Sequence, residues 1–319
     1  MFEGKSPGWY GRWRANHTVF SCGVTALIVA VQLIRSGTDP GGSVPMVPSE
    51  TEVAMLAIAV AFFGVPHGAT DHLVGSALFR RVFGGVWLPV FVVVYLAMMA
   101  LVVLCWYALP TFSLLAFLLM SVVHWGLGDV EEDLTPPWLL PIEVVVRGSV
   151  AIVIPCVAFR TNVSHIFGWL VGAPADAPSI SWIMDAFGWI VLPMALGLTS
   201  VFMFHVSHVI SDQRLHETLT TSAADSKTRR HLGAAAEVAL LAAMCCLCSP
   251  LVAFVVYFCL WHSFRHIMVV ACTAFDDKRA GRALLIFFLQ ASPFTIATLV
   301  LAWVSWERIL EASPSGQVA

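Results

Sequence analysis

Long apolar stretches alternate with short polar segments along the whole chain, and nine of them are long enough to cross a membrane. A helix needs about 20 predominantly apolar residues to span about 30 Å of hydrocarbon. The pattern therefore predicts an all-α fold, a polytopic bundle of about nine transmembrane helices. The nine stretches lie near residues 18–36, 53–79, 86–109, 111–127, 138–158, 181–210, 232–248, 250–274 and 283–306.

The first stretch, 18–36, is the one whose status changes the number of spans. Lys5, Arg12 and Arg14 precede it, as basic residues precede the apolar region of a signal peptide. It lacks a clear small-x-small cleavage site, so we interpret it as a retained anchor helix. If it were removed, eight spans would remain and the later loops would keep their sides.

The Lys and Arg residues gather on one side of the predicted bundle. Cytoplasmic loops carry an excess of these residues, which sets the orientation of multispanning proteins. With the N-terminus in the cytoplasm, twelve of the 17 fall on the inner side and three on the outer side. We therefore expect a multi-pass protein of the inner (plasma) membrane with a cytoplasmic N-terminus. The inner residues are Lys5, Arg12, Arg14, Arg80, Arg81, Arg214, Lys227, Arg229, Arg230, Lys278, Arg279 and Arg282.

Composition and charge agree with a lipid environment. Hydrophobic residues make up 59% of the chain and charged residues 12%, with a mean hydropathy of +0.83, whereas a soluble domain carries about a quarter charged residues. The net charge of −3 and the lack of a basic stripe give no indication of a nucleic-acid partner. No repeat or long linker divides the chain, so residues 1–319 are expected to form one integral membrane domain, with 211–231 as a cytoplasmic loop.

Seven of the 11 histidines fall inside the predicted spans, and they fall in one layer. His17, His165, His216 and His231 are assigned to connecting segments, as solvated or interfacial residues. The other seven occupy the second halves of four spans that all run from outside to inside. Because an unpaired imidazole in lipid is costly, we expect these seven to face one another in the cytoplasmic half of the bundle. They are His67, His72, His124, His205, His208, His262 and His266.

The local sequence around the histidines adds detail. In W-H-S-F-R-H, His262 and His266 are spaced i, i+4, so they project from one helix face and can bind one metal ion together. Pro66 precedes His67 and a glycine follows it, so the helix is expected to be kinked or broken there. In H-W-G-L-G-D, two glycines and an aspartate follow His124, which indicates a helix end.

Several polar and aromatic neighbours are candidates for supporting roles. Asp71 could accept an imidazole N–H from His72, and Arg265 needs a carboxylate partner, for which Asp71 and Asp129 are candidates. The aromatic residues near the histidines could line a substrate tunnel. These are Trp125, Phe204, Tyr257, Phe258, Trp261 and Phe264.

The residues by themselves favour a metal site and leave two other interpretations open. Paired histidines on facing helices can ligate haem axially. Histidines and carboxylates inside a membrane can also form the proton relay of a transporter.

Three motifs in order resemble a known family. P-H-G-A-T-D-H (66–72), H-W-G-L-G-D (124–129) and W-H-S-F-R-H (261–266) resemble the Brp/Blh family of membrane-embedded β-carotene 15,15′-dioxygenases. The resemblance covers roughly residues 53–306, so the span at 18–36 is extra. It implies that O2 is added across the central double bond of β-carotene to give two all-trans-retinal molecules. A retinal-binding rhodopsin could then accept the product.

The resemblance also implies a ligand set: Fe(2+) held by His67, His124, His262 and His266. Four neutral imidazoles suit Fe(2+) and leave up to two octahedral positions open for O2. The alternative is a histidine-rich di-iron hydroxylase or desaturase, for which His72, His205 and His208 could supply additional ligands. A transporter is the alternative from a different class.

Overall fold

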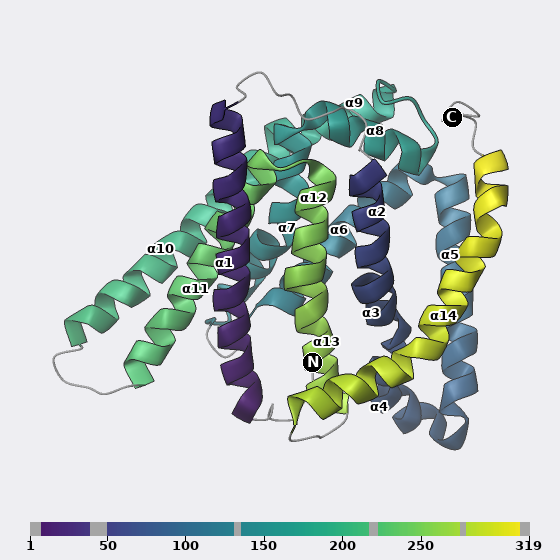
Figure 1. Cartoon of the computed structure of the whole chain (residues 1–319), viewed down its shortest axis with the longest axis horizontal. Helices are drawn as coiled ribbons and strands as arrows, with labels where there is room; N and C mark the ends of the chain where they lie inside the picture. The colour runs from purple at the N-terminus through teal and green to yellow at the C-terminus, as the bar shows by residue number, and fades with distance from the viewer. Residues whose placement is uncertain (1–7, 39–49, 131–134, 217–222, 275–278, 313–319) are drawn as a thin grey trace.

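The computed structural model describes residues 8–38, 50–130, 135–216, 223–274 and 279–312, and these residues form a helical bundle (Figure 1). The element η2 is a 3-10 helix, and η1, η3 and η4 are π-helices. In chain order the elements are α1 (Gly8–Thr38), α2 (Glu50–Ala59), η1 (Val60–Gly64), α3 (Val65–Ala69), α4 (Asp71–Phe83), η2 (Gly84–Val86), α5 (Trp87–Ala108), α6 (Pro110–Asp129), α7 (Leu140–Ala158), α8 (Arg160–Val171), α9 (Pro178–Ala186), η3 (Phe187–Val191), α10 (Leu192–His216), α11 (Ala223–Leu247), α12 (Pro250–Val255), η4 (Val256–Ser263), α13 (Phe264–Ala274) and α14 (Ala280–Ala312).

Eight helical stretches of the described residues are long and apolar enough to cross a membrane, which confirms the prediction of an all-α polytopic bundle. One of them, Ala54–Ala108, contains the two predicted spans 53–79 and 86–109, because α4 and η2 connect them with little interruption. The eight stretches therefore include each of the nine predicted apolar segments to within about two residues at each end.

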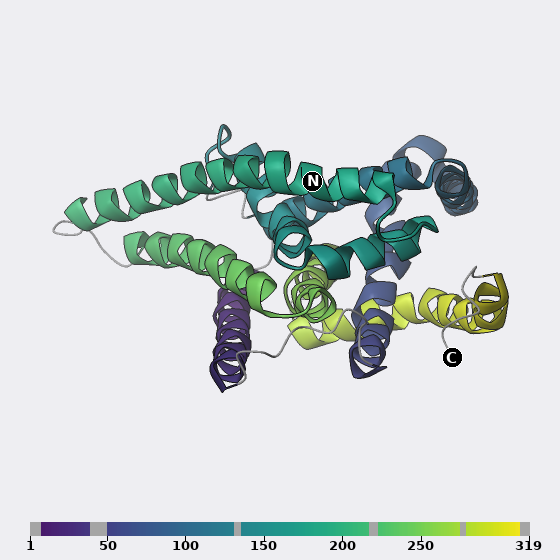
Figure 2. The same cartoon turned by 90° about the horizontal axis from the view of Figure 1, so that it is seen from above.

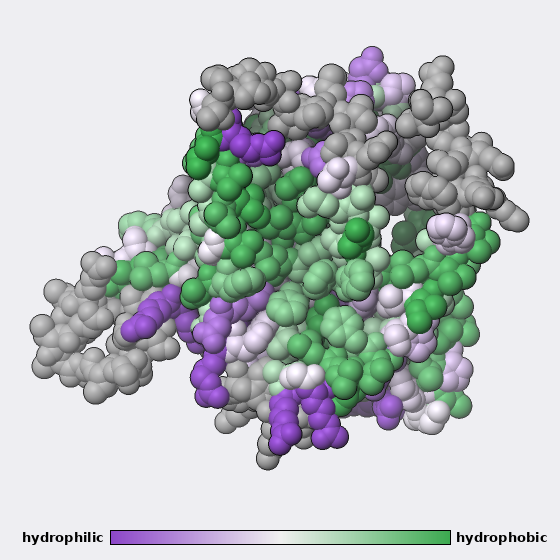
Figure 3. Space-filling model, in the orientation of Figure 1, coloured by the Kyte–Doolittle hydropathy of each residue, from purple (hydrophilic) through white to green (hydrophobic). Residues whose placement is uncertain are grey.

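The outer surface is apolar over much of its height. On α5 the side chains of Val93, Val103 and Tyr107 are 67%, 67% and 87% exposed. Exposing a whole apolar helix in this way is unfavourable in water and favourable in lipid. Figure 3 shows hydrophobic residues covering the middle of one face, with hydrophilic side chains toward its upper and lower ends. The chain is a membrane protein by this distribution and by its spans.

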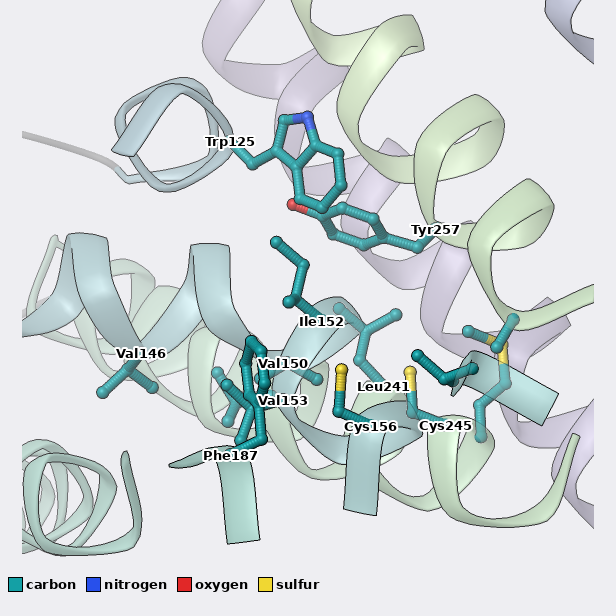
Figure 4. Packing of buried hydrophobic residues seen from close by; sticks show 14 of the residues in the cluster. Trp125, Val146, Val150, Ile152, Val153, Cys156, Phe187, Leu241, Cys245 and Tyr257 are labelled. Atoms are coloured by element: carbon teal, nitrogen blue, oxygen red, sulfur yellow. The ribbon is translucent and has the colours of Figure 1, made fainter. Parts of the chain in front are cut away.

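The core of the bundle is built on close packing between α6 and α7. A Cβ added to Gly126 would lie 2.0 Å from the carbonyl oxygen of Val144, and one added to Gly148 would lie 1.8 Å from that of Val122. Small residues let membrane helices approach closely, which gives van der Waals contact where lipid supplies no hydrophobic drive. Figure 4 shows the buried residues of α7 packed beneath Trp125 of α6 and a tyrosine from η4.

Two interrupted helices run side by side through the centre of the molecule. The series α2–η1–α3 lies beside the series α12–η4–α13, and η1 contacts η4 (Figure 1). On one side, α1 packs against α11 and η4; on the other, α14 packs against α3 and α13. Viewed from above, α10 and α11 extend together away from this centre (Figure 2).

Candidate metal centre

Four histidines from three separate parts of the chain meet between the central helices. His67 comes from α3, His124 from the last turns of α6, His262 from η4 and His266 from the first turn of α13. The six pairs of rings have centroids between 4.1 Å (His67–His266) and 6.4 Å (His262–His266) apart. Ligand nitrogens of His67, His124 and His262 lie within 4.8 Å of one another.

This spacing fits ligands of one metal ion for five of the six ring pairs, whereas the His67 and His266 rings, at 4.1 Å, lie closer together. An imidazole nitrogen lies about 2.1 Å from a divalent ion, so two rings on the same ion have centroids roughly 4.5 to 6.5 Å apart. The Nδ1 atom of His67 and both ring nitrogens of His262 are buried and, among the described residues, have no hydrogen-bond partner. Buried polar atoms are nearly always paired, so these nitrogens are suited to bind an ion that the protein chain itself does not supply.

The backbone departs from α-helical geometry next to these ligands. The π-helix η1 ends at Gly64, three residues before His67, and the π-helix η4 contains His262. π-helical turns are rare and are found mostly at functional sites. The interruption predicted around Pro66 is present, since a π-helix precedes Pro66 and Thr70 separates α3 from α4. The hydroxyl of Thr70 donates a hydrogen bond to the carbonyl of His67 at 3.1 Å.

The end of α6 makes room for the His262 ring. The helix ends at Asp129, as the glycines in the motif predicted. A Cβ added to Gly128 would lie 3.1 Å from Cε1 of His262, so a larger residue would press on that ring. His262 is buried, whereas His124 is exposed, so the centre opens to the surface of the bundle beside His124.

A buried network of charges adjoins the histidines. Nη1 of Arg265 lies 3.2 Å from Oδ1 of Asp129 and 2.8 Å from Oε1 of Glu237. Glu237 also binds Arg147 at 3.0 Å, and Arg147 binds Glu143 at 2.7 Å. The network thus joins α6, α7, α11 and α13, and the carboxylate partner expected for Arg265 is Asp129 together with Glu237.

Glu237 was missed by the sequence analysis. It is the only acidic residue in the predicted span 232–248, and its side chain is 3% exposed. An isolated carboxylate in lipid requires a cation partner. Arg265 is an intramembrane cation that needs a carboxylate partner, so the two residues could have been matched from the sequence.

Asp71 does not join this network. It accepts a hydrogen bond from the hydroxyl of Tyr95 at 3.3 Å, and the ring of His72 faces an aromatic ring instead. The expected Asp71–His72 contact is therefore replaced by two separate ones. The ring of His72 packs against Phe294, with centroids 5.2 Å apart.

The other candidate histidines also lie apart from the four. His205 on α10 packs against Trp138 at 5.6 Å and against His231 at 6.5 Å between ring centroids, and His208 is exposed. In the part of the chain that the structure describes, only His67, His124 and His262 form a group of three or more potential ligands with this close spacing. The expectation that all seven intramembrane histidines face one another is wrong for these residues.

Two histidines assigned to connecting segments are buried within helices. His17 lies in α1 at 5% exposure and His231 in α11 at 6%. The assignment of His17 to a polar segment was wrong because α1 begins at Gly8, ten residues before the predicted span.

The aromatic tunnel candidates divide into three groups. Trp125, Tyr257 and Phe258 lie beside the histidines, with ring centroids 6.2, 6.4 and 6.1 Å from that of His262. Tyr257 also donates its hydroxyl to Asp129 at 2.9 Å. By contrast, Trp261 and Phe264 pack against α1, and Phe204 is 72% exposed on α10.

Comparisons with known proteins point to one family. The family model described as "Beta-carotene 15,15'-dioxygenase" matches residues 58–317. The chain is 30% identical over 289 residues to a probable beta-carotene 15,15'-dioxygenase Blh of Halobacterium salinarum. This alignment covers 82% of this chain and 76% of that protein. It is 29% identical over 211 residues to a beta-carotene 15,15'-dioxygenase of an uncultured marine bacterium, covering 66% of each chain. No solved structure gives a significant match.

Proposed function

Because the chain belongs to the beta-carotene 15,15'-dioxygenase family, we propose that it cleaves the central double bond of β-carotene with O2 at one iron ion held by four histidines. The products are two all-trans-retinal molecules. The proposed ligands are His67, His124, His262 and His266. The observation that carries the proposal is that these rings, from segments almost 200 residues apart, have all six centroid separations at 6.4 Å or less.

The residues at the centre suit this chemistry. Neutral imidazoles are good ligands for Fe(2+), and bound there the ion supplies the site at which O2 is activated. The substrate is a hydrocarbon, so its binding free energy comes from burial, at about 25 cal/mol per Å² of apolar surface. Trp125, Tyr257 and Phe258 offer such a surface next to the histidines.

The position of His124 supports entry from lipid. It is exposed on α6, and its neighbours Val123 and Leu127 are 43% and 45% exposed on an apolar helix surface. A substrate dissolved in the bilayer therefore reaches the centre sideways without crossing water, and retinal leaves by the same route. A rhodopsin in the same membrane could collect it.

The charge distribution supports a cytoplasmic N-terminus in the inner membrane. Helix α4, which carries Arg80 and Arg81, and the start of α14, which carries Arg282, lie at the same end of the molecule as the start of α1 (Figure 1). By the positive-inside tendency, we infer that this end faces the cytoplasm.

Two alternatives have less support from the geometry. A di-iron hydroxylase needs more ligands than four, but His72 and His205 pack against other aromatic rings and His208 is exposed. A transporter using a proton relay does not explain why the ring nitrogens of His262 find no polar partner among the residues that the structure describes.

Metal analysis of purified protein together with retinal detection tests the proposal. We expect one iron per chain and two retinals per β-carotene consumed, with both aldehyde oxygens labelled from 18O2. Two irons per chain with a hydroxylated product would favour the di-iron enzyme. Ion-coupled transport by metal-free protein in liposomes would favour the transporter.

A further inference from the structure

Helix α1 carries a stripe of polar side chains on its inner face. Arg14, His17, Ser21 and Thr25 follow one another at intervals of three or four residues and are 9%, 5%, 0% and 0% exposed. Other side chains of α1 are apolar and exposed, as Val19 at 75% and Phe20 at 62% show. Polar groups inside a bilayer need partners within the protein. A helix that served only as a membrane anchor would not require such a stripe.

The partners of this stripe belong to the segment that carries two of the four histidines. Nε2 of His17 donates to the carbonyl of Leu260 at 2.8 Å. The indole Nε1 of Trp261 donates to the Thr25 hydroxyl at 3.2 Å. Leu260 and Trp261 are the two residues before His262, within the π-helix η4.

Two further contacts reach the same centre. Nη2 of Arg265, the residue before His266, donates to the hydroxyl of Thr18 at 3.2 Å. Nη2 of Arg14 donates to the carbonyl of Asp129 at 2.7 Å, at the end of α6, the helix that carries His124. The last carbonyls of a helix have no partner within it, and a cation there is favourable.

We propose that α1 is a positioning element of the metal centre. It holds the carbonyl of Leu260, the indole of Trp261 and the guanidinium of Arg265, and thereby fixes the direction in which His262 and His266 point. This inference rests on the four-histidine site proposed above. The match to the family model begins at residue 58, so α1 lies outside it and adds support that the matched region does not contain.

The π-helical geometry explains why such support is needed. A π turn is wider than an α turn and its hydrogen bonding is less regular, so its stability depends on the surroundings. Since η4 contains His262, any return of this segment toward α-helical geometry would turn the ring away from the others. The hydrogen bond from His17 to Leu260 holds a carbonyl inside that segment.

The test compares variants that remove one α1 contact with variants that keep it. His17→Leu removes the donor to Leu260, whereas His17→Gln can keep an N–H near the same place. Thr25→Val removes the acceptor for Trp261 at nearly constant shape. Phe20→Leu, on the lipid-facing side of α1, is the matched control.

The readouts are the rate of iron loss to a chelator and the separate values of kcat and KM. We expect His17→Leu and Thr25→Val to lose iron about 10–100-fold faster and to lower kcat, as changes to groups that orient metal ligands do. KM for β-carotene should stay unchanged, and His17→Gln and Phe20→Leu should resemble the unmodified protein.

Equal iron retention in His17→Leu and the unmodified protein would overturn the inference, as would equal loss in the Leu and Gln variants. If His17→Leu fails to insert, Thr25→Val decides alone: iron loss at the unmodified rate would overturn the inference. If the unmodified protein holds no iron, the proposed function fails and this inference with it. If the unmodified protein holds iron and Thr25→Val matches it, only the role of α1 fails.

Discussion

Arg265 binds both carboxylate oxygens of Glu237, with Nη1–Oε1 at 2.8 Å and Nη2–Oε2 at 2.9 Å. The two side chains are 1% and 3% exposed, so the pair is enclosed by protein. The pair connects α13 to α11 through Arg265, which lies between His262 and His266 in the sequence. Its geometry is bidentate, the arrangement that a guanidinium and a carboxylate form most strongly.

Replacing Glu237 with Gln should therefore destabilise the protein by about 3–5 kcal/mol, because two buried guanidinium groups lose a compensating charge. The measurement is the free energy of unfolding in bicelles or mild detergent. The control is Asp185→Asn, which breaks the pair with Arg160 at 2.7 Å, where the side chains are 47% and 57% exposed. An exposed pair contributes about 0–1 kcal/mol, so equal effects of the two substitutions would contradict the role given to the buried pair.

Replacing His262 or His266 with Ala should abolish bound iron and retinal formation while the protein still inserts. His72→Ala and His208→Ala should keep one iron per chain, because these side chains have other surroundings. Iron content and activity of the same preparations check this. Full iron content in His262→Ala, or loss of iron in His208→Ala, would show that the ligand set is wrong.

Asp129 should matter more to the centre than Asp71. Asp129 is 1% exposed and binds Arg265 and Tyr257, whereas Asp71 binds only Tyr95 among the contacts described above. We expect Asp129→Asn to lower iron affinity or kcat by about 10–100-fold and Asp71→Asn to change either by much less. A metal titration of both variants measures the difference. A larger effect of Asp71→Asn would show that Asp71, and not Asp129, supports the metal centre.

Replacing Gly126 with Ala should disrupt the contact of α6 with α7, since the new Cβ would lie 2.0 Å from the carbonyl oxygen of Val144. Because His124 is two residues earlier, iron binding should weaken together with stability. Gly197→Ala in α10 is the control: its Cβ would meet no atom within 4 Å, and Ala is the better helix former by about 1 kcal/mol. Comparable melting temperatures for the two variants would contradict the close-packing argument.

The orientation predicts which end of the molecule is accessible from each side. A cysteine at Arg81, exposed in α4, should react with a membrane-impermeant maleimide only in inverted vesicles or opened cells. A cysteine at Thr161, exposed in α8 at the other end, should react in intact cells. A background without native cysteines is needed, and the reverse labelling pattern would invert the topology.

The apolar pattern of the sequence located the spans, and the histidine spacing identified His262 and His266 as a pair, for identifiable physical reasons. Apolar stretches of membrane length and the i, i+4 spacing of His262 and His266 are local patterns. The grouping of these two with His67 and His124 depended on the family resemblance. Spacing gave no reason to separate them from His205 and His208.

What the sequence did not predict depends on which side a helix turns to its neighbours. Phe204 is near His205 in sequence and yet is 72% exposed, because that face of α10 points outward. Glu237 gained its importance from Arg265 and Arg147, on two other helices. Contacts of this kind are set by packing between elements far apart in sequence, and one residue's neighbours along the chain do not reveal them.

The π-helix η4 has a consequence for how relatives of this protein should be compared. A turn of π-helix holds about one residue more than a turn of α-helix, and each residue advances an α-helix by about 100°. Deleting a single residue within 256–263 would therefore return this segment to α-helical geometry, which would change the direction in which the His262 ring points. Conservation of length between Pro250 and His266 should thus be a stricter marker of a working centre than conservation of the residues between them. A homologue with a gap there is expected to have lost the site even if all four histidines remain.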